Sequence, residues 1–79
     1  MKYAELENKL RPLETVIRMA GITIMAHQQM FDVSAAAGDW EDCEKHREIL
    51  KTQIDIQCDA KISEHRMVLE WKKQGARYD

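Results

Sequence analysis

One apolar pattern constrains this chain more than any other feature, because it runs unbroken through most of the first half. Apolar or small side chains recur in alternating steps of three and four. An average step of 3.5 residues is typical of a helix that packs along another helix. These residues are Tyr3, Leu6, Leu10, Leu13, Ile17, Ala20, Ile24, His27, Phe31 and Ser34. The pattern predicts a long helix over residues 2–37.

Pro12 is the residue that opposes a continuous helix in this segment. Proline removes one backbone hydrogen bond and clashes with the preceding turn. The apolar spacing is unchanged on both sides of it, which favours one helix kinked at Pro12. The alternative is a break, with a short first helix and Pro12 in the first turn of the main one.

The chain is predicted to reverse direction at residues 38–39. Gly38 follows a run of alanines, and glycine just past a helix is a common left-handed stop. Asp39 can cap the next helix, and Asp42 follows three residues later, in the spacing of a capping box with an acidic third member. Because a short connection makes antiparallel neighbours, the turn predicts a helical hairpin.

The second helix is predicted over residues 40–74, with Gly75 ending it. Its apolar residues begin with heptad-like steps and then take two steps of four, which predicts a local stutter in the packing. The predicted seam is Trp40, Cys43, Arg47, Leu50, Ile54, Cys58, Ile62, His65 and Leu69. The whole chain, residues 1–79, is therefore predicted to be a single all-α domain, a long antiparallel hairpin.

The first helix also carries a second stripe, about 120–130° around the helix from the seam. It consists of Met19, Ile22, Ala26, Met30 and Val33. A two-helix hairpin covers only one stripe, so this second stripe predicts an interaction surface. Self-association into a four-helix bundle or coiled coil, as a homodimer or higher oligomer, is one outcome. Binding of a different protein is the other.

Trp71 is a further candidate for the protein interface. It falls at the predicted open end of the hairpin, near Tyr3 and Tyr78. Aromatic residues of this kind anchor many protein interfaces. The alternative is that Trp71 closes the end of the bundle. Trp40 is expected to cover the opposite, closed end.

The sequence predicts no enzyme and contains no candidate catalytic, cofactor-binding or metal residues. A zinc site needs four convergent ligands, whereas Cys43 and Cys58 lie about 22 Å apart along one straight helix. The same separation excludes an intrachain disulfide between them. The two thiols are therefore expected to be small, buried and reduced, in a cytoplasmic protein. No Gly-rich phosphate loop is present.

Net charge is −2, which argues against general nucleic-acid binding. A modest basic end keeps a small RNA-binding hairpin as a further alternative; its residues are Lys9, Arg11, Arg66, Lys72, Lys73 and Arg77. No membrane association is expected, because the most apolar window is interrupted by His27, Gln28 and Gln29.

In its length, its all-helical hairpin plan and its lack of catalytic motifs, the chain resembles small phage-encoded antirepressors. That resemblance implies binding to a DNA-binding phage repressor and release of the genes that the repressor silences. The segment AAAGDWED, residues 35–42, is similar to the turn of FliT-like flagellar export chaperones. This second resemblance implies a structural adaptor or a chaperone-like helical dimer.

Overall fold

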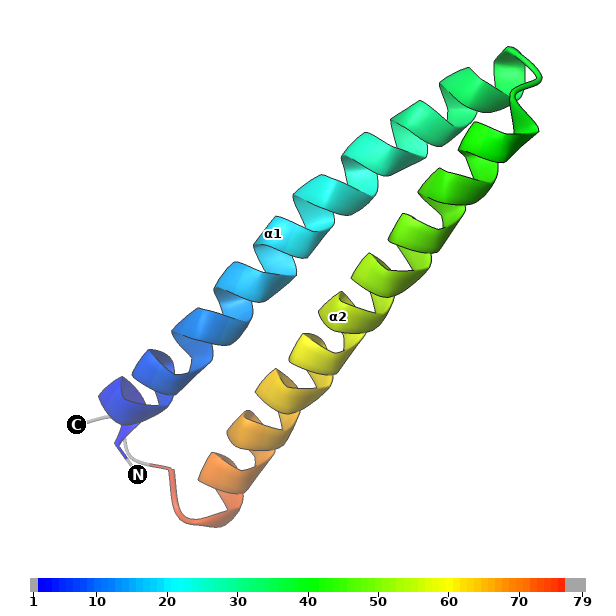
Figure 1. The fold of residues 1–79 in the computed structure, drawn as a ribbon. Coiled ribbons are helices and arrows are strands. Elements are labelled where there is room, and N and C mark those ends of the chain that lie inside the picture. The colour runs from blue at the N-terminus through cyan, green and yellow to red at the C-terminus, as the bar shows by residue number, and fades with distance from the viewer. Residues whose placement is uncertain (1, 77–79) are drawn as a thin grey trace.

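The computed structural model describes residues 2–76 and contains two long antiparallel helices joined by a tight turn (Figure 1). Helix α1 spans Tyr3–Ala36 and helix α2 spans Trp40–Lys73. The hairpin is 56 Å long and 16 by 13 Å across. The turn forms its closed end, while the start of α1 and the end of α2 meet at its open end. The predicted all-α hairpin is confirmed.

Helix α1 continues through Pro12 without interruption, so the alternative of a break at this residue is wrong. Pro12 is exposed, and the carbonyl group that loses its helical partner can bond to water. The lost backbone bond is outweighed because α1 packs on α2 both before and after Pro12: Leu6 and Ala20 are both buried. Tertiary packing thus overrides the local preference of proline.

The turn has the geometry that its sequence predicts. Gly38 has a φ of 71°, and its N–H donates to Ala35 while the N–H of Asp39 donates to Ser34. This pair of bonds is the Schellman ending of a helix. Asp39 Oδ1 accepts from the N–H of Asp42 at 3.1 Å, which confirms the predicted N-cap. The reciprocal half of the capping box is not formed, because the Asp42 carboxylate bonds elsewhere.

The predicted seam of α1 is confirmed beyond its first residue, whereas most of the α2 prediction is wrong. Only Cys43 and Leu50 of the predicted α2 seam are buried or half-buried. The exposed members are Trp40, Arg47, Ile54, Cys58, Ile62, His65 and Leu69. The observed seam is Cys43, His46, Leu50, Gln53, Gln57, Ala60, Glu64, Met67 and Trp71. It keeps the three-four alternation throughout, so the predicted stutter is absent.

Two polar side chains of the α2 seam, Gln57 and His46, have hydrogen-bond partners on α1. Gln57 Nε2 donates to the carbonyl oxygen of Ile17 at 3.1 Å. Gly21 permits this approach, since a Cβ atom there would lie 3.3 Å from Gln57 Nε2. A buried polar group that is hydrogen-bonded carries little penalty. The seam therefore follows the heptad period rather than the isoleucines, and Ile54 and Ile62 remain outside.

Candidate protein-binding face

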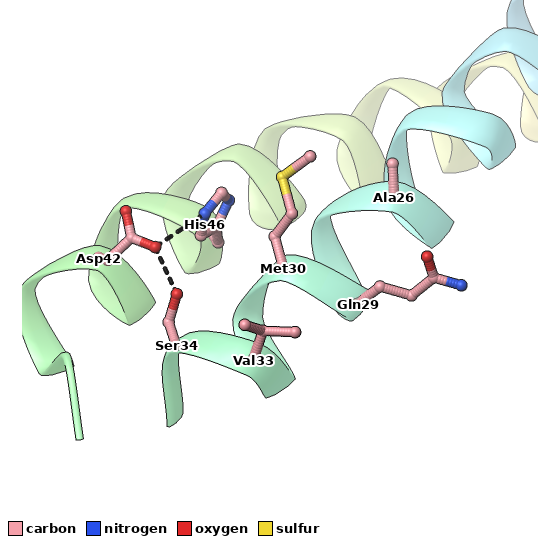
Figure 2. Close-up of a pocket in the computed structure, with 7 residues that line it drawn as sticks. All are labelled: Ala26, Gln29, Met30, Val33, Ser34, Asp42 and His46. Atoms are coloured by element: carbon pink, nitrogen blue, oxygen red, sulfur yellow. Dashed lines mark hydrogen bonds and ion pairs between the residues drawn. The ribbon is translucent and has the colours of Figure 1, made fainter. Parts of the chain in front are cut away.

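Four polar side chains link the two helices beside the turn, and we call them the closed-end network. The Ser34 hydroxyl donates to Asp42 Oδ2, and that oxygen lies 3.2 Å from His46 Nε2 (Figure 2). His46 Nδ1 lies 2.7 Å from His27 Nδ1. Because Ser34 and His27 belong to α1 and the other two to α2, the network ties the helices together.

Hydrogen bonding determines which ring nitrogens of the two histidines donate and which accept. The Asp42 carboxylate only accepts, so His46 donates from Nε2. In neutral His46 the Nδ1 atom then accepts from the Nδ1–H of His27. With both imidazoles doubly protonated, two N–H groups would face each other across 2.7 Å.

The order of these side chains differs from that of a catalytic triad. In a Ser-His-Asp triad the imidazole lies between the hydroxyl and the carboxylate and removes the hydroxyl proton. Here the carboxylate of Asp42 lies between Ser34 and His46. Ser34 is also buried. The arrangement favours a structural connection over nucleophilic catalysis.

The closed-end network shifts the titration of one of its own groups. The hydrogen bond from Ser34 lowers the pKa of Asp42 below its ordinary value of 3.8, against the opposing effect of partial burial. The charge of His46 when it is protonated, the hydrogen bond from His46 and the positive charge of Lys45 lower this pKa further. Asp42 is therefore held as the anion that accepts from both Ser34 and His46.

The cysteine next to this network is shifted in the opposite sense. Burial raises the pKa of the Cys43 thiol above its ordinary value of 9.0, and nearby carboxylates, Asp39 first, raise it further. The thiol donates weakly to the carbonyl oxygen of Phe31, with Sγ 3.7 Å from it. Cys43 is buried as predicted, but Cys58 is exposed, which corrects the expectation of two buried thiols.

The second stripe of α1 lies largely in solvent. Its exposed fractions are 59% for Met19, 61% for Ile22 and 70% for Val33. Met30 is 47% exposed, and Ala26 is half-buried. The five predicted interface residues of this stripe therefore form an accessible strip on a single helix. Met19 and Val33 are 14 residues apart, so the strip is about 21 Å long.

Three more exposed apolar residues extend this strip across the hairpin. Val16 precedes a seam residue of α1, and Ile49 and Ile56 precede seam residues of α2. In two antiparallel helices, the residue that precedes a seam residue points to the same side of the hairpin on either helix. The second stripe lies on that side as well. We call the second stripe together with Val16, Ile49 and Ile56 the apolar face.

Two shallow grooves lie along α1 and share Ala26 and Gln29. Figure 2 shows the first, where Met30 and Val33 lie beside Asp42 and His46 of the closed-end network. The second groove lies on the side of α1 that faces away from α2. The first is lined by Ala26, Gln29, Met30, Val33, Ser34, Asp42 and His46, the second by Arg18, Gly21, Ile22, Met25, Ala26 and Gln29. Of the two shared residues, Ala26 has the smaller side chain.

Trp71 is separate from the apolar face, which corrects the prediction that it anchors a partner. It is only 4% exposed, and its ring lies 5.8 Å from the ring of Tyr3. It is buried because the regular seam of α2 extends to Trp71 at the open end. Tyr78, predicted to join it, lies outside the described residues. Trp40, expected to cover the closed end, is 66% exposed.

The sequence predicts the second stripe but not the closed-end network. Its pattern places Ser34 and His27 in the seam of α1 and Asp42 in a helix cap. A signal was present, since His46 follows Cys43 by three residues and continues the three-four alternation. Its polarity concealed the position, because seam residues are normally apolar.

Over residues 2–76, no three side chains of the metal-binding types are grouped so that they could hold an ion. Neither helix, over the same residues, has a stretch long and apolar enough to cross a membrane. Comparison with protein-family models, with curated proteins and with solved structures finds no match to this chain.

Proposed function

We propose that this chain is a non-enzymatic, protein-binding regulator that sequesters a partner protein through its apolar face. The observation that carries the proposal is the exposure of the second stripe, on the same side of the hairpin as exposed Ile49 and Ile56 of α2. Contiguous exposed apolar surface marks protein-interaction sites. The methionines Met19 and Met30 suit this role, because unbranched thioether side chains adapt to the shape of a partner.

A DNA-binding repressor is the partner class that the resemblance to small phage-encoded antirepressors implies. In that version of the proposal, the hairpin binds the repressor in the cytoplasm and lowers the amount that occupies DNA. The effect on transcription comes from this competition and requires no chemistry by the hairpin. The length of the chain and its hairpin architecture support this version.

A structural adaptor or export-chaperone-like helical dimer is the second candidate. It is favoured by the length of the apolar face, which follows α1 from Val16 to Val33, about 26 Å of helix. A surface of that shape matches another long helix. In this version the face is used only by a second copy, and no other protein is sequestered.

Affinity capture from the native host, followed by mass spectrometry, tests the proposal. The intact chain is compared with Val33→Glu, which places a charge on the apolar face, and with Gln28→Glu, which places the same charge on an exposed site outside it. We expect the intact chain and Gln28→Glu to retain the same partner and Val33→Glu to lose it. The partner is then tested for loss of DNA binding on addition of the hairpin.

The outcomes separate the candidates. Recovery of a DNA-binding repressor that the hairpin removes from DNA supports the antirepressor version. Recovery of the chain alone supports the structural candidate and contradicts sequestration. A partner retained equally by Val33→Glu shows that the apolar face does not carry the binding.

A further inference from the structure

We infer that a second copy of this chain occupies the apolar face, with α1 packed antiparallel to α1 of the copy about a two-fold axis at Ala26. The inference rests on the proposed function and names the first protein that covers this face. A different partner then binds by replacing the copy.

The hairpin leaves more surface uncovered than a compact monomer of its mass. A compact monomer of 9.3 kDa exposes roughly 5000 Å², whereas this hairpin exposes 5913 Å². The excess, roughly 900 Å², is close to the ~800 Å² that each partner contributes to a standard interface. The buried residues among 2–76 are few: Leu6, Ala20, Ser34, Cys43, Ala60 and Trp71. A core this small requires an occupant present whenever the chain folds, and a copy meets that condition.

The spacing of the second stripe is symmetric about its central residue. Its steps are three, four, four and three, with Ala26 at the centre. In an antiparallel pair centred on Ala26, Met19 lies opposite Val33 of the copy and Ile22 lies opposite Met30. Large side chains therefore meet large ones, and the smallest meets itself.

Helix α1 has a small side chain at the proposed axis. Ala26 lines both grooves and has a smaller side chain than Gln29, the other residue that they share. Small residues allow two helices to approach closely at their crossing point. The longer side chains of Met30 and Ile22 flank Ala26 and can enter the grooves of the copy.

The distribution of charged side chains favours the antiparallel direction. Residues 30–50, around the closed end, carry six acidic and two basic side chains. A parallel pair would place two such ends side by side, and like charges in contact are unfavourable. The antiparallel pair separates them. Each acidic end then lies level with the middle of the other hairpin, where residues 14–25 and 51–61 carry three acidic and three basic side chains and no net charge.

This arrangement has a definite length. At 1.5 Å per residue, the open end of each hairpin lies about 36 Å from Ala26 and the closed end about 18 Å. The antiparallel dimer is therefore staggered and about 72 Å long. A parallel, in-register dimer keeps the 56 Å length of one hairpin.

Cysteine cross-linking tests the register, in a background of Cys43→Ala and Cys58→Ser whose helicity is checked by circular dichroism. We expect Ala26→Cys to form a disulfide-linked dimer on mild oxidation. Met19→Cys and Val33→Cys are expected to cross-link only when mixed, since residues 19 of the two copies lie about 21 Å apart. Cross-linking of Met19→Cys with itself would show a parallel pair and overturn the inference.

Sedimentation and small-angle scattering test the dimer without any cysteine. We expect a two-chain species about 72 Å long. Ile22→Glu, at a site 61% exposed in one hairpin, should raise its dissociation constant at least about 100-fold, because the axis places the charge in the interface twice. Gln28→Glu should leave the constant unchanged. A monomeric intact chain at about 100 µM, or a 56 Å dimer, would overturn the inference.

These results are distinguishable from failure of the proposed function. A monomer that still captures a partner through Val33 contradicts the dimer and leaves sequestration intact. A staggered dimer that captures nothing contradicts sequestration and leaves the dimer intact.

Discussion

The two ends of the hairpin are held by different chemistry. At the open end, Leu6 and Trp71 are 2% and 4% exposed, and Trp71 packs against Tyr3. At the closed end, Ser34 and Asp42 bond to each other across the helices and continue to the paired histidines. One end is stabilised mainly by apolar burial and the other by hydrogen bonds.

The difference shows how a two-helix protein obtains both stability and register. Apolar burial is roughly proportional to area and has no preferred direction. Hydrogen bonds have strict distances and angles, so a shift of one helix along the other breaks them. The apolar contacts of the open end contribute free energy of folding in proportion to the area that they bury. The closed-end network, with the bond from Gln57 to Ile17, fixes how the seams align.

The largest expected effect is at the open end. Trp71→Ala should lower the free energy of unfolding by about 3–5 kcal/mol, because it removes the largest buried side chain of the seam and leaves a cavity. The matched control is Trp40→Ala, where the ring is 66% exposed and the expected loss is below about 0.5 kcal/mol. Urea denaturation followed by circular dichroism measures both. Equal losses would contradict the assignment of Trp71 to the core.

A smaller effect is expected from the histidine pair. His27→Ala should lower the free energy of unfolding by about 1–3 kcal/mol, since it leaves Nδ1 of half-buried His46 without its partner. Gln28→Ala, at the exposed neighbouring position, should change it by less than about 0.5 kcal/mol. Thermal or urea unfolding of the two variants provides the comparison. If they unfold alike, the histidine pair does not stabilise the closed end.

The pH dependence of the closed end is expected to follow Asp42. Its pKa in the folded chain is below 3.8, so the stabilisation from the ionised carboxylate is present above 3.8 and is lost as pH falls through the lower value. In Ser34→Ala the pKa of Asp42 should rise towards 3.8, because the largest cause of its lowering is removed. The side-chain carboxyl NMR shift of Asp42, followed with pH, measures this. An unchanged pKa in Ser34→Ala would contradict the hydrogen bond.

The smallest effect is a difference in reactivity between the two thiols. Cys58 is exposed and should alkylate rapidly with iodoacetamide at neutral pH, whereas Cys43 is buried and should react slowly. Because the pKa of Cys43 is raised above 9.0, stability is unaffected by this group below 9.0 and falls as pH rises further through the folded value. Mass spectrometry with time distinguishes the two sites. Equal rates would show that the closed end opens readily.

The boundaries of the fold follow from local sequence. Gly38 ends α1 in a left-handed conformation and Asp39 caps α2, as predicted from these two residues. Gly75 has a φ of 79° beyond the end of α2. Such signals are readable because each acts on backbone groups within one turn of helix. The second stripe was also predictable, because all five residues lie on a single helix with a known period.

The tertiary structure alone determined which face of α2 meets α1. The isoleucines of α2 predicted a seam through Ile54 and Ile62, yet the seam contains Gln57 and His46. The reason is that these polar groups are paired by α1, through the carbonyl oxygen of Ile17 and the ring of His27. Whether a polar side chain can be buried depends on a partner distant in sequence, so the periodicity of one helix does not determine it.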